Sequence, residues 1–447
     1  MVYRTLRLIF FPLLTTMAFG SAPLSAASYK ISLETSIGLP QGQRPQHIVG
    51  DLSFRDYLVT YDLLPEVRNP IVVIARDREV WYVDGLTLDV LQRLKYGPDQ
   101  SVVVSPNGRY LAVYSSAYNR KSGKTFHSIQ VDDWTGRECW KAPLRSSVEP
   151  TSRGGLLSHV SGHPAEAQDT YSWPEPNEEP QLRPHPLVIY DDVGRPVLEG
   201  VDYSECRYQI KYASMSPDGR YLAYLFRWIP EENRESRGHP EQDRACLVLY
   251  DIDAATEMWR HYFDGRMPAS VTVGPSAQRI LCFVATTEVE GVSPPMNYAM
   301  FLFDDAGGLI TKKVVAGCDS IFSPNRPVLS ADGKLCCFNT HDSRVYVIKM
   351  EDGAELWHWP SQGNELEIQT PSVANDGSVV AFGSSGNPRA GTQVIEAVFF
   401  DSKGNLVREL SAESPGDTDR WIGVSGDGGS FWVADAESLR LYRVAIE

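Results

Sequence analysis

The sequence predicts an all-β fold, a single β-propeller built from repeated four-stranded blades. Two hairpin patterns alternate along the chain, one with an Asn-Gly or Asp-Gly turn and one whose first strand ends near an acidic residue. The chain has 447 residues, 42% of them hydrophobic and 11% aromatic, which suits one large core and excludes global disorder.

The first hairpin pattern reads Ser-Pro-Asp-Gly-Arg-Tyr-Leu-Ala in its best copy. Asn-Gly and Asp-Gly supply the positive φ angles that tight hairpin turns require, and the flanking runs are apolar, as buried strands should be. Five clear copies and one decayed copy begin at Ser105, Ser216, Ser330, Ala374, Ser425 and, for the decayed one, Gly274.

The second hairpin pattern sets the number of blades. Eight of its apolar strands can be placed, and their ends recur every 46 to 60 residues from Asp84 to Asp401, a period that fits four short strands. We therefore expect eight blades, with seven as the alternative. The last strand lacks a following partner, so we expect Tyr29–Ile37 to close the ring as the fourth strand of the last blade.

The third unit is the weakest. Its first two strands are expected within Arg153 to Trp173, where the pattern is degraded, and long insertions are expected at about 146–186 and 230–244. The insertions belong to the connections that open on one face of a propeller. Loops of this length are usually functional or disordered, so we expect ligand or partner contacts on that face, with tolerated insertions as the alternative.

The first 27 residues have the pattern of a signal peptide. Arg4 and Arg7 precede an apolar stretch from Leu8 to Phe19, and small residues precede Ser28. We expect residues 1–27 to be cleaved, leaving a propeller domain at 28–447 that is periplasmic or secreted and has no transmembrane anchor. An uncleaved anchor is the alternative.

The composition also limits the partners. The formal net charge is −15, whereas nucleic acid and anionic membranes require a basic surface. Nucleic acid is therefore not expected as a partner. The charge does not identify another partner, but the face with the long loops is expected to bind a protein or glycan.

These repeats resemble known propeller families. The Ser-Pro-Asp-Gly-Arg-Tyr-Leu-Ala copies are similar to WD40-like and periplasmic TolB-type repeats. The segment Asp132 to Trp140 resembles the quinoprotein-type (PQQ-like) repeat Asp-x-x-Thr-Gly-x-x-x-Trp. The resemblance implies that one tryptophan docks each such blade on its neighbour, a role that falls to Trp140, Trp259 and Trp357.

The adjacent cysteines Cys336 and Cys337 invite comparison with quinoprotein dehydrogenases, in which a vicinal disulfide covers the quinone. Alignment on the Asp-Gly turn places Cys337 in a column with Ala112, Ala223 and Ala381. That column requires a small buried residue, so we interpret both cysteines as core residues.

No catalytic motif is found. The sequence has no Gly-x-Ser-x-Gly elbow, His-Glu-x-x-His helix or Cys-x-x-Cys-His haem motif. Asp251 and Asp253 could be part of a calcium site, although turn acids are more often solvated. We expect no catalytic residue, no metal and no cofactor.

The mouth of the central channel carries the predicted ligand site. Positions just before the innermost strands are polar and include three cations in an otherwise acidic chain. We predict a shallow site for a polar or anionic group, with solvation of a water-filled channel as the alternative. Its residues are Lys211, Tyr212, Arg326, Arg420 and Trp421.

The sequence thus predicts an exported, non-catalytic binding or scaffold module. The alternative is an enzyme at the channel mouth, either a quinone- or metal-dependent oxidoreductase or a lactonase-like hydrolase. A structural surface protein without a soluble ligand is a third hypothesis.

Overall fold

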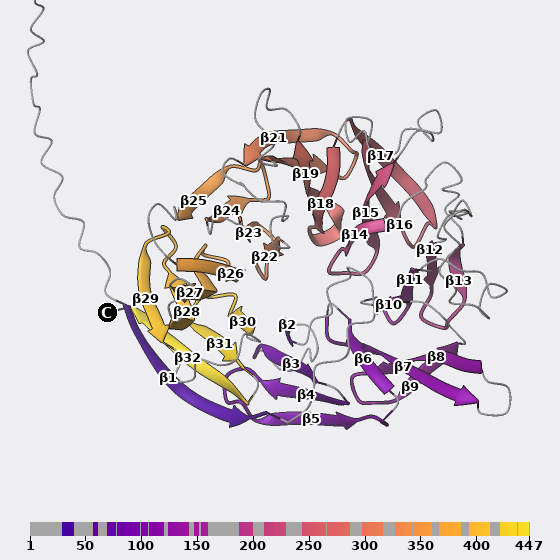
Figure 1. Ribbon diagram of the computed structural model, residues 1–447, viewed down its shortest axis with the longest axis horizontal. Helices are drawn as coiled ribbons and strands as arrows, with labels where there is room; N and C mark the ends of the chain where they lie inside the picture. The colour runs from indigo at the N-terminus through magenta and orange to yellow at the C-terminus, as the bar shows by residue number, and fades with distance from the viewer. Residues whose placement is uncertain are drawn as a thin grey trace, which may run out of the picture.

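In the computed structural model, most of the described residues form strands of one propeller (Figure 1). The all-β prediction and the four-stranded blades are confirmed, and the described residues form eight four-stranded antiparallel sheets around a central axis. The predicted signal peptide, residues 1–27, lies outside the residues that the structure describes. The described residues are 29–39, 57–60, 69–76, 78–98, 100–105, 107–119, 124–142, 147–151, 153–159, 187–199, 210–228, 244–264, 266–286, 297–315, 327–340, 344–359, 366–385, 393–411, 421–435 and 437–446.

The first four blades follow one another along the chain, and in each the first strand lies nearest the axis and the fourth at the periphery (Figure 1). Blade 1 contains β2 (Tyr57–Thr60), β3 (Ile71–Arg76), β4 (Glu79–Asp84) and β5 (Val90–Lys95), and blade 2 contains β6 (Gln100–Val104), β7 (Tyr110–Asn119), β8 (Lys124–Asp133) and β9 (Glu138–Ala142). Blade 3 contains β10 (Ser147–Pro150), β11 (Leu156–His159), β12 (Leu187–Tyr190) and β13 (Pro196–Glu199), and blade 4 contains β14 (Ile210–Met215), β15 (Tyr221–Trp228), β16 (Arg244–Asp251) and β17 (Thr256–Asp264).

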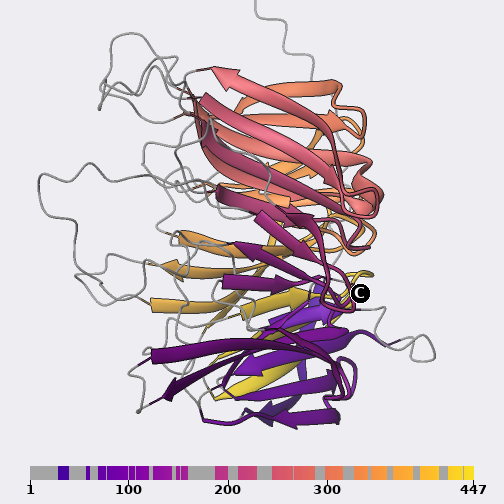
Figure 2. The ribbon, with the colours of Figure 1, turned by 90° about the vertical axis from the view of Figure 1, so that its right-hand side faces the viewer.

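The other four blades complete the disc, whose strands run across its thickness (Figure 2). Blade 5 contains β18 (Arg266–Val273), β19 (Arg279–Thr286), β20 (Asn297–Asp304) and β21 (Leu309–Val315), and blade 6 contains β22 (Val328–Leu329), β23 (Leu335–Asn339), β24 (Val345–Lys349) and β25 (Glu355–Trp359). Blade 7 contains β26 (Leu366–Val373), β27 (Val379–Ser385), β28 (Gln393–Phe400) and β29 (Leu406–Ser411), and blade 8 contains β30 (Trp421–Val424), β31 (Ser430–Ala434), β32 (Ser438–Ile446) and β1 (Tyr29–Gly38).

The N-terminal strand β1 is the outer strand of blade 8, as the sequence predicted. It pairs antiparallel with β32, from Tyr29 opposite Ile446 to Gly38 opposite Ser438. Ile31 is 5% exposed within the apolar cluster between blades 7 and 8, and its carbonyl accepts a 2.9 Å hydrogen bond from Arg408 Nη1. The two ends of the described chain therefore hold each other in one sheet.

The serine of the Ser-x-Asp-Gly repeat organises the first turn of a blade. Ser105 Oγ accepts a hydrogen bond from the main-chain N–H of Tyr110 at 3.0 Å and donates one to Asn107 Oδ1 at 2.8 Å. The serine hydroxyl thus accepts from a main-chain N–H of the turn and is itself held by the side chain two residues later. This explains why a serine followed by asparagine or aspartate recurs at this turn. The same two bonds are made by Ser216, Ser330 and Ser425.

The predicted position of the first two strands of blade 3 is partly wrong. These strands are β10 (Ser147–Pro150) and β11 (Leu156–His159). β11 lies within the predicted range of Arg153 to Trp173, whereas β10 lies before it. The expected insertion at 146–186 therefore contains a hairpin, while 160–186 lies outside the described residues. The turn was missed because Thr151 Oγ1, not Ser-x-Asp-Gly, caps it by accepting the N–H of Gly155 at 3.0 Å.

The core is divided among the blade interfaces. The eight apolar clusters of the described residues each join two consecutive blades, and together they complete the circle. The cluster between blades 4 and 5 includes Leu249 and Phe303, both 0% exposed. Each blade therefore buries both faces against its neighbours, which accounts for the continuous apolar runs of its central strands.

Four interfaces share a tryptophan contact. Trp140 Nε1 donates to Gly154 O at 2.8 Å and Trp259 Nε1 to Asp305 O at 2.9 Å. Trp357 Nε1 donates to Gly377 O at 3.0 Å. These three tryptophans link blade 2 to 3, blade 4 to 5 and blade 6 to 7.

Trp432, which the sequence analysis did not select, makes the fourth contact. Its Nε1 donates to Gly85 O at 2.8 Å and links blade 8 to blade 1. It occupies the column held by Ala112 and Cys337 in other blades. The larger ring fits because residue 85 is a glycine. A Cβ at this position would lie 2.9 Å from the indole, which is too close.

The other four interfaces use different donors for the same task. Tyr82 donates to Gly108 O at 3.1 Å between blades 1 and 2, and Lys313 Nζ donates to Gly353 O at 2.8 Å between blades 5 and 6. Arg153 links blade 3 to 4, and the N–H of Asn375 donates to Gly426 O at 2.9 Å between blades 7 and 8. Tryptophan-docked interfaces therefore alternate with interfaces of another chemistry.

The adjacent cysteines are core residues, as predicted. Cys336 and Cys337 are both 0% exposed and carry free thiols. They point into different clusters, Cys336 between blades 5 and 6 and Cys337 between blades 6 and 7. Burial raises the pKa of both thiols, so they are held protonated and unreactive.

We predict that Gly404→Ala destabilises the ring through the tryptophan contact. Gly404 has φ +80°, and a Cβ there would lie 2.7 Å from the ring of Trp357. A loss of about 1–3 kcal/mol in the free energy of unfolding is expected, measured by chemical denaturation. Gly429→Ala is the control, because its nearest contact is 3.4 Å away. Equal effects of the two changes would contradict the prediction.

Candidate functional site

The predicted channel-mouth residues are only partly described. Tyr212 on β14 is half-buried against the apolar cluster between blades 4 and 5, and Trp421 on β30 is half-buried against the one between blades 8 and 1. Arg326 and Arg420 lie outside the described residues, as does the side chain of Lys211. The anionic-ligand site at the channel mouth therefore stays a prediction, and its two aromatic members contribute to the core.

Hydroxyl groups of the inner strands serve the neighbouring blade. Ser214 Oγ accepts the N–H of Val273 at 3.2 Å, and Ser372 Oγ accepts the N–H of Val424 at 3.2 Å. Thr272 Oγ1 donates to Pro327 O at 3.1 Å. The polar residues of these inner strands thus satisfy main-chain groups across the blade boundary.

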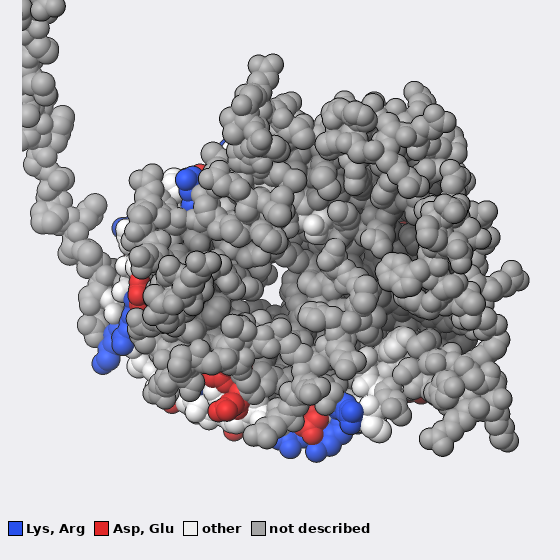
Figure 3. Space-filling model, viewed as in Figure 1, with Lys and Arg blue, Asp and Glu red and all other residues white. Residues whose placement is uncertain are grey.

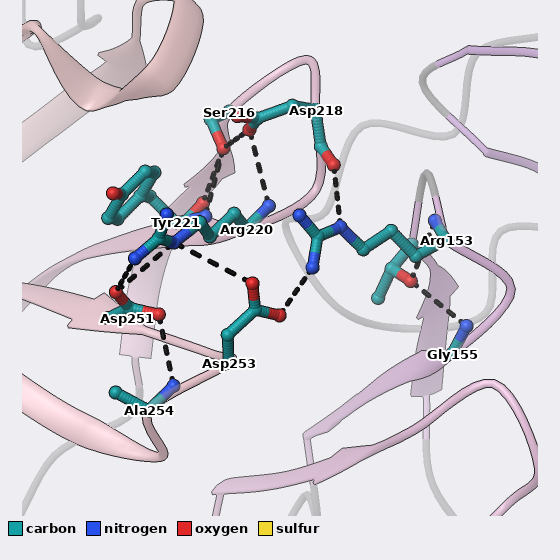
Figure 4. A network of polar contacts seen from close by, with 10 residues as sticks. Arg153, Gly155, Ser216, Asp218, Arg220, Tyr221, Asp251, Asp253 and Ala254 are labelled. Carbon is teal, nitrogen blue, oxygen red and sulfur yellow. Dashed lines mark hydrogen bonds and ion pairs between the residues drawn. The ribbon is translucent and has the colours of Figure 1, made fainter.

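A polar network lies on the face that carries the tight turns, between blades 3 and 4 (Figure 4). Arg153, in the turn between β10 and β11, donates from Nε to Asp218 O at 3.1 Å. Its Nη1 forms an ion pair with the carboxylate of Asp253, in the turn between β16 and β17. The two side chains are 45% and 47% exposed, so the pair lies at the surface.

Arg220 holds the second half of this network. Its Nη2 lies 2.7 Å and its Nε 3.2 Å from Asp251 Oδ2, and Nε also lies 3.7 Å from Asp253 Oδ2 (Figure 4). Asp251 also accepts the N–H of Ala254 at 3.1 Å. The hydrogen bond from Arg220 lowers the pKa of Asp251 below its usual value of 3.8, with the turn N–H groups adding to the effect.

Asp218 connects a third blade. One of its carboxylate oxygens accepts from the Ser216 hydroxyl and from the N–H of Arg220 at 3.3 Å. The other accepts from Ser276 Oγ of blade 5 at 3.4 Å. We call Arg153, Asp218, Arg220, Asp251 and Asp253 the turn-face network.

The turn-face network consists of arginine–aspartate contacts that link two blades. Asp251 and Asp253, considered above as part of a calcium site, instead face the guanidinium groups of Arg220 and Arg153. Among the described residues no group of three or more His, Cys, Asp or Glu could hold a metal ion. The arginines neutralise the carboxylates, so the network joins blades 3 and 4 where blade 3 has only short strands.

The sequence contained only part of the signal for this network. Arg220 follows the Asp-Gly turn as Arg109 does in blade 2, so its position in the turn was visible. Its partner Asp251 ends a strand 31 residues later, and Arg153 meets Asp253 across 100 residues. The pairing of β15 with β16 brings Arg220 to Asp251, and the packing of blade 3 on blade 4 brings Arg153 to Asp253.

A second feature lies at the periphery of the disc. In the part of the chain that the structure describes, every exposed large apolar side chain lies on the outermost strand of a blade or in the turn just before it. We call this set the outer-strand surface: Leu33, Val90, Leu91, Val193, Val197, Met258, Tyr262, Leu309, Val314, Leu356 and Leu406. Charged side chains of the described residues also lie along the periphery in the view of Figure 3.

Comparison with known proteins concerns the fold. No protein-family model and no curated protein matches the chain. Similar solved structures include BamB from Moraxella catarrhalis, with 11% identity, a TM-score of 0.48 and coverage of 93% of this chain and 100% of that chain. Another is the Cps50 (Swd1) β-propeller domain of Myceliophteria thermophila, with 12% identity, a TM-score of 0.47 and the same coverage.

The assignment of this chain as a β-propeller rests on its own strand pairing. Identities of 11% and 12% carry no information on activity, so the function is argued from the surfaces. Of the residues described, no helix has the length and apolar character to cross a membrane.

We predict that Arg220→Gln weakens the protein toward acid. The folded pKa of Asp251 lies below 3.8, so its contribution is present above that pH and is lost as the pH falls through the folded pKa. Without Arg220 the folded pKa rises and acid unfolding begins at a higher pH, which circular dichroism along a pH titration would measure.

Arg153→Gln is the matched control for this experiment. It removes an arginine of the same network whose carboxylate partner, Asp253, is 47% exposed. Exposed ion pairs contribute little, and the hydrogen bond from Arg153 to Asp218 O that is also lost does not titrate. The stability of this variant should therefore fall by a similar amount at every pH, with no added loss in acid. Equal shifts for the two variants would contradict the assignment of Asp251.

Proposed function

We propose that this protein is an exported, non-catalytic propeller, periplasmic or secreted, that binds or organises a protein partner. The observation that carries the proposal is the outer-strand surface. Its exposed apolar side chains recur beside the unpaired edges of the outer strands in seven of the eight blades. Free strand edges with apolar side chains next to them are suited to contact other proteins, whereas a single exposed leucine would need no explanation.

The rigidity of the ring supports the scaffold role. Each blade interface is closed by an apolar cluster and by a hydrogen bond to a main-chain carbonyl. A binding surface held in fixed geometry loses little conformational entropy when a partner docks. A protein supplies main-chain groups as well as side chains, so it suits sheet edges better than a glycan does.

We expect the protein to exist in a complex in its native host. The full chain, tagged at its C-terminus and produced from its own promoter, should elute under mild conditions at a mass well above 49.8 kDa, together with a stoichiometric second protein. Light scattering coupled to size exclusion, followed by mass spectrometry of the peak, would measure this. Recovery as a partner-free monomer would contradict the proposal.

Export has its own test. We expect the mature protein to begin at Ser28, because small residues precede that position. N-terminal sequencing of the protein from the extracytoplasmic fraction measures it. A variant with Arg4 and Arg7 changed to Glu should stay in the cytoplasm with residues 1–27 intact. A native protein that still begins at Met1 in the cytoplasm would overturn the export proposal.

A further inference from the structure

The outer strand of blade 5, β21, is one of two outer strands that carry two cations and no acidic residue, the other being β5. It reads Leu-Ile-Thr-Lys-Lys-Val-Val and contains no acidic residue, in a chain with a net charge of −15. It pairs with β20 on one edge, and no described strand pairs with the other edge, which lies at the periphery (Figure 1).

The two lysines of β21 are fixed on opposite faces of the blade. Lys312 Nζ lies 5.7 Å from the centre of the Phe301 ring, on the side of blade 4. Lys313 Nζ donates to Gly353 O of blade 6 at 2.8 Å. Lysines on an edge strand often prevent it from pairing with another strand. The ammonium groups of these two lysines contact groups on the two faces of the blade, so they do not lie along the unpaired main-chain edge of β21.

Neither lysine has a carboxylate partner among the described residues. Other cationic outer strands differ in this respect, since Lys95 of β5 pairs with Glu79 at 2.9 Å. Arg260 of β17 is held by both carboxylate oxygens of Glu257. A partner's carboxylates can therefore neutralise both positive charges of β21 without first breaking an ion pair.

The backbone of β21 is also suited to pairing. After a bulge near Ile310, the register with β20 is regular from Thr311 opposite Leu302 to Val315 opposite Tyr298. At the two ends of the strand, Leu309 is 48% exposed and Val314 58% exposed, the latter more than any other large apolar side chain described. The strand thus offers a regular edge flanked by apolar contacts.

We propose that β21 binds an extended acidic segment of a partner protein by strand addition to its free edge. Main-chain hydrogen bonds supply the affinity in this mode, and alternating side chains supply the selectivity. The proposal rests on the protein-binding function proposed above and names the surface and the chemistry of the occupant.

The positions of the lysines define the sequence of that occupant. Adjacent residues of a strand point to opposite faces, so Lys312 and Lys313 require two consecutive acidic residues, one for each face. β-Branched residues on either side would contact Leu309 and Val314. The motif Thr-Val-Glu-Glu-Val-Thr meets these requirements and serves as the probe.

Fluorescence anisotropy of the labelled probe peptide with the full-length protein tests the proposal. We expect saturable binding that weakens with salt, and at least about tenfold weaker binding to the Lys312→Glu variant, which keeps the Lys313 bond to Gly353 O between blades 5 and 6. The control variant is Lys403→Glu, which changes the net charge equally at an exposed position in the turn between β28 and β29 and should bind as the unaltered protein does.

Backbone methylation separates strand addition from simple charge attraction. Probes N-methylated at alternate residues on one edge should lose binding for one of the two possible sets and keep it for the other, because only one edge faces β21. Binding that survives both sets, or that falls equally in the control variant, would overturn the proposal. If the probe does not bind while the native complex is recovered, the docking surface is wrong and the proposed function stands.

Discussion

A hydrogen bond from each blade to a main-chain carbonyl of the next blade is the constraint on which this ring depends. The carbonyls lie in tight turns or at their edges, where the sheet cannot satisfy them, and each would cost free energy if buried without a donor. At four interfaces the donor is a tryptophan, and the indole also fills the space above a turn glycine. At the other four it is a tyrosine, an arginine, a lysine or a main-chain amide.

This alternation divides the disc into pairs of blades. The cluster between blades 2 and 3 has only four fully buried members, so Trp140 carries a larger share of the contact there. Between blades 3 and 4, blade 3 contributes Ile189 to the apolar cluster, and the turn-face network adds the polar link. Half-exposed ion pairs contribute little free energy, so the network fixes geometry more than stability.

The same packing decides where the molecule can bind. The central strands are buried on both faces and hydrogen-bonded on both edges, and the described inner-strand hydroxyls already serve neighbouring blades. Among the described strands, the innermost and the outermost of each blade have one unpaired edge, and only the outermost also carry exposed large apolar side chains. Among them β21 combines a regular edge with positive charge that no described carboxylate neutralises. Binding at the periphery is therefore expected, because the faces and edges of the central strands are already packed and hydrogen-bonded.

The sequence by itself determined the propeller class, the four-stranded blades, the closing strand at Tyr29 and the burial of the cysteine pair. These follow from local rules: turn glycines, Ser-x-Asp caps and apolar runs act within a few residues of one another. The first hairpin of blade 3 was misplaced because Thr151 caps its turn without the repeat pattern.

Tertiary structure alone decided which distant residues meet. Trp432 reaches Gly85 across 347 positions, and Arg153 reaches Asp253 across 100. The direction of a lysine side chain on an outer strand depends on the acceptors of the neighbouring blade. For Lys313 the acceptor is the carbonyl of Gly353. The contact of Trp432 depends on the closure of the ring, and the other two depend on the packing of consecutive blades. No local pattern in the sequence encodes which side chains this packing brings together.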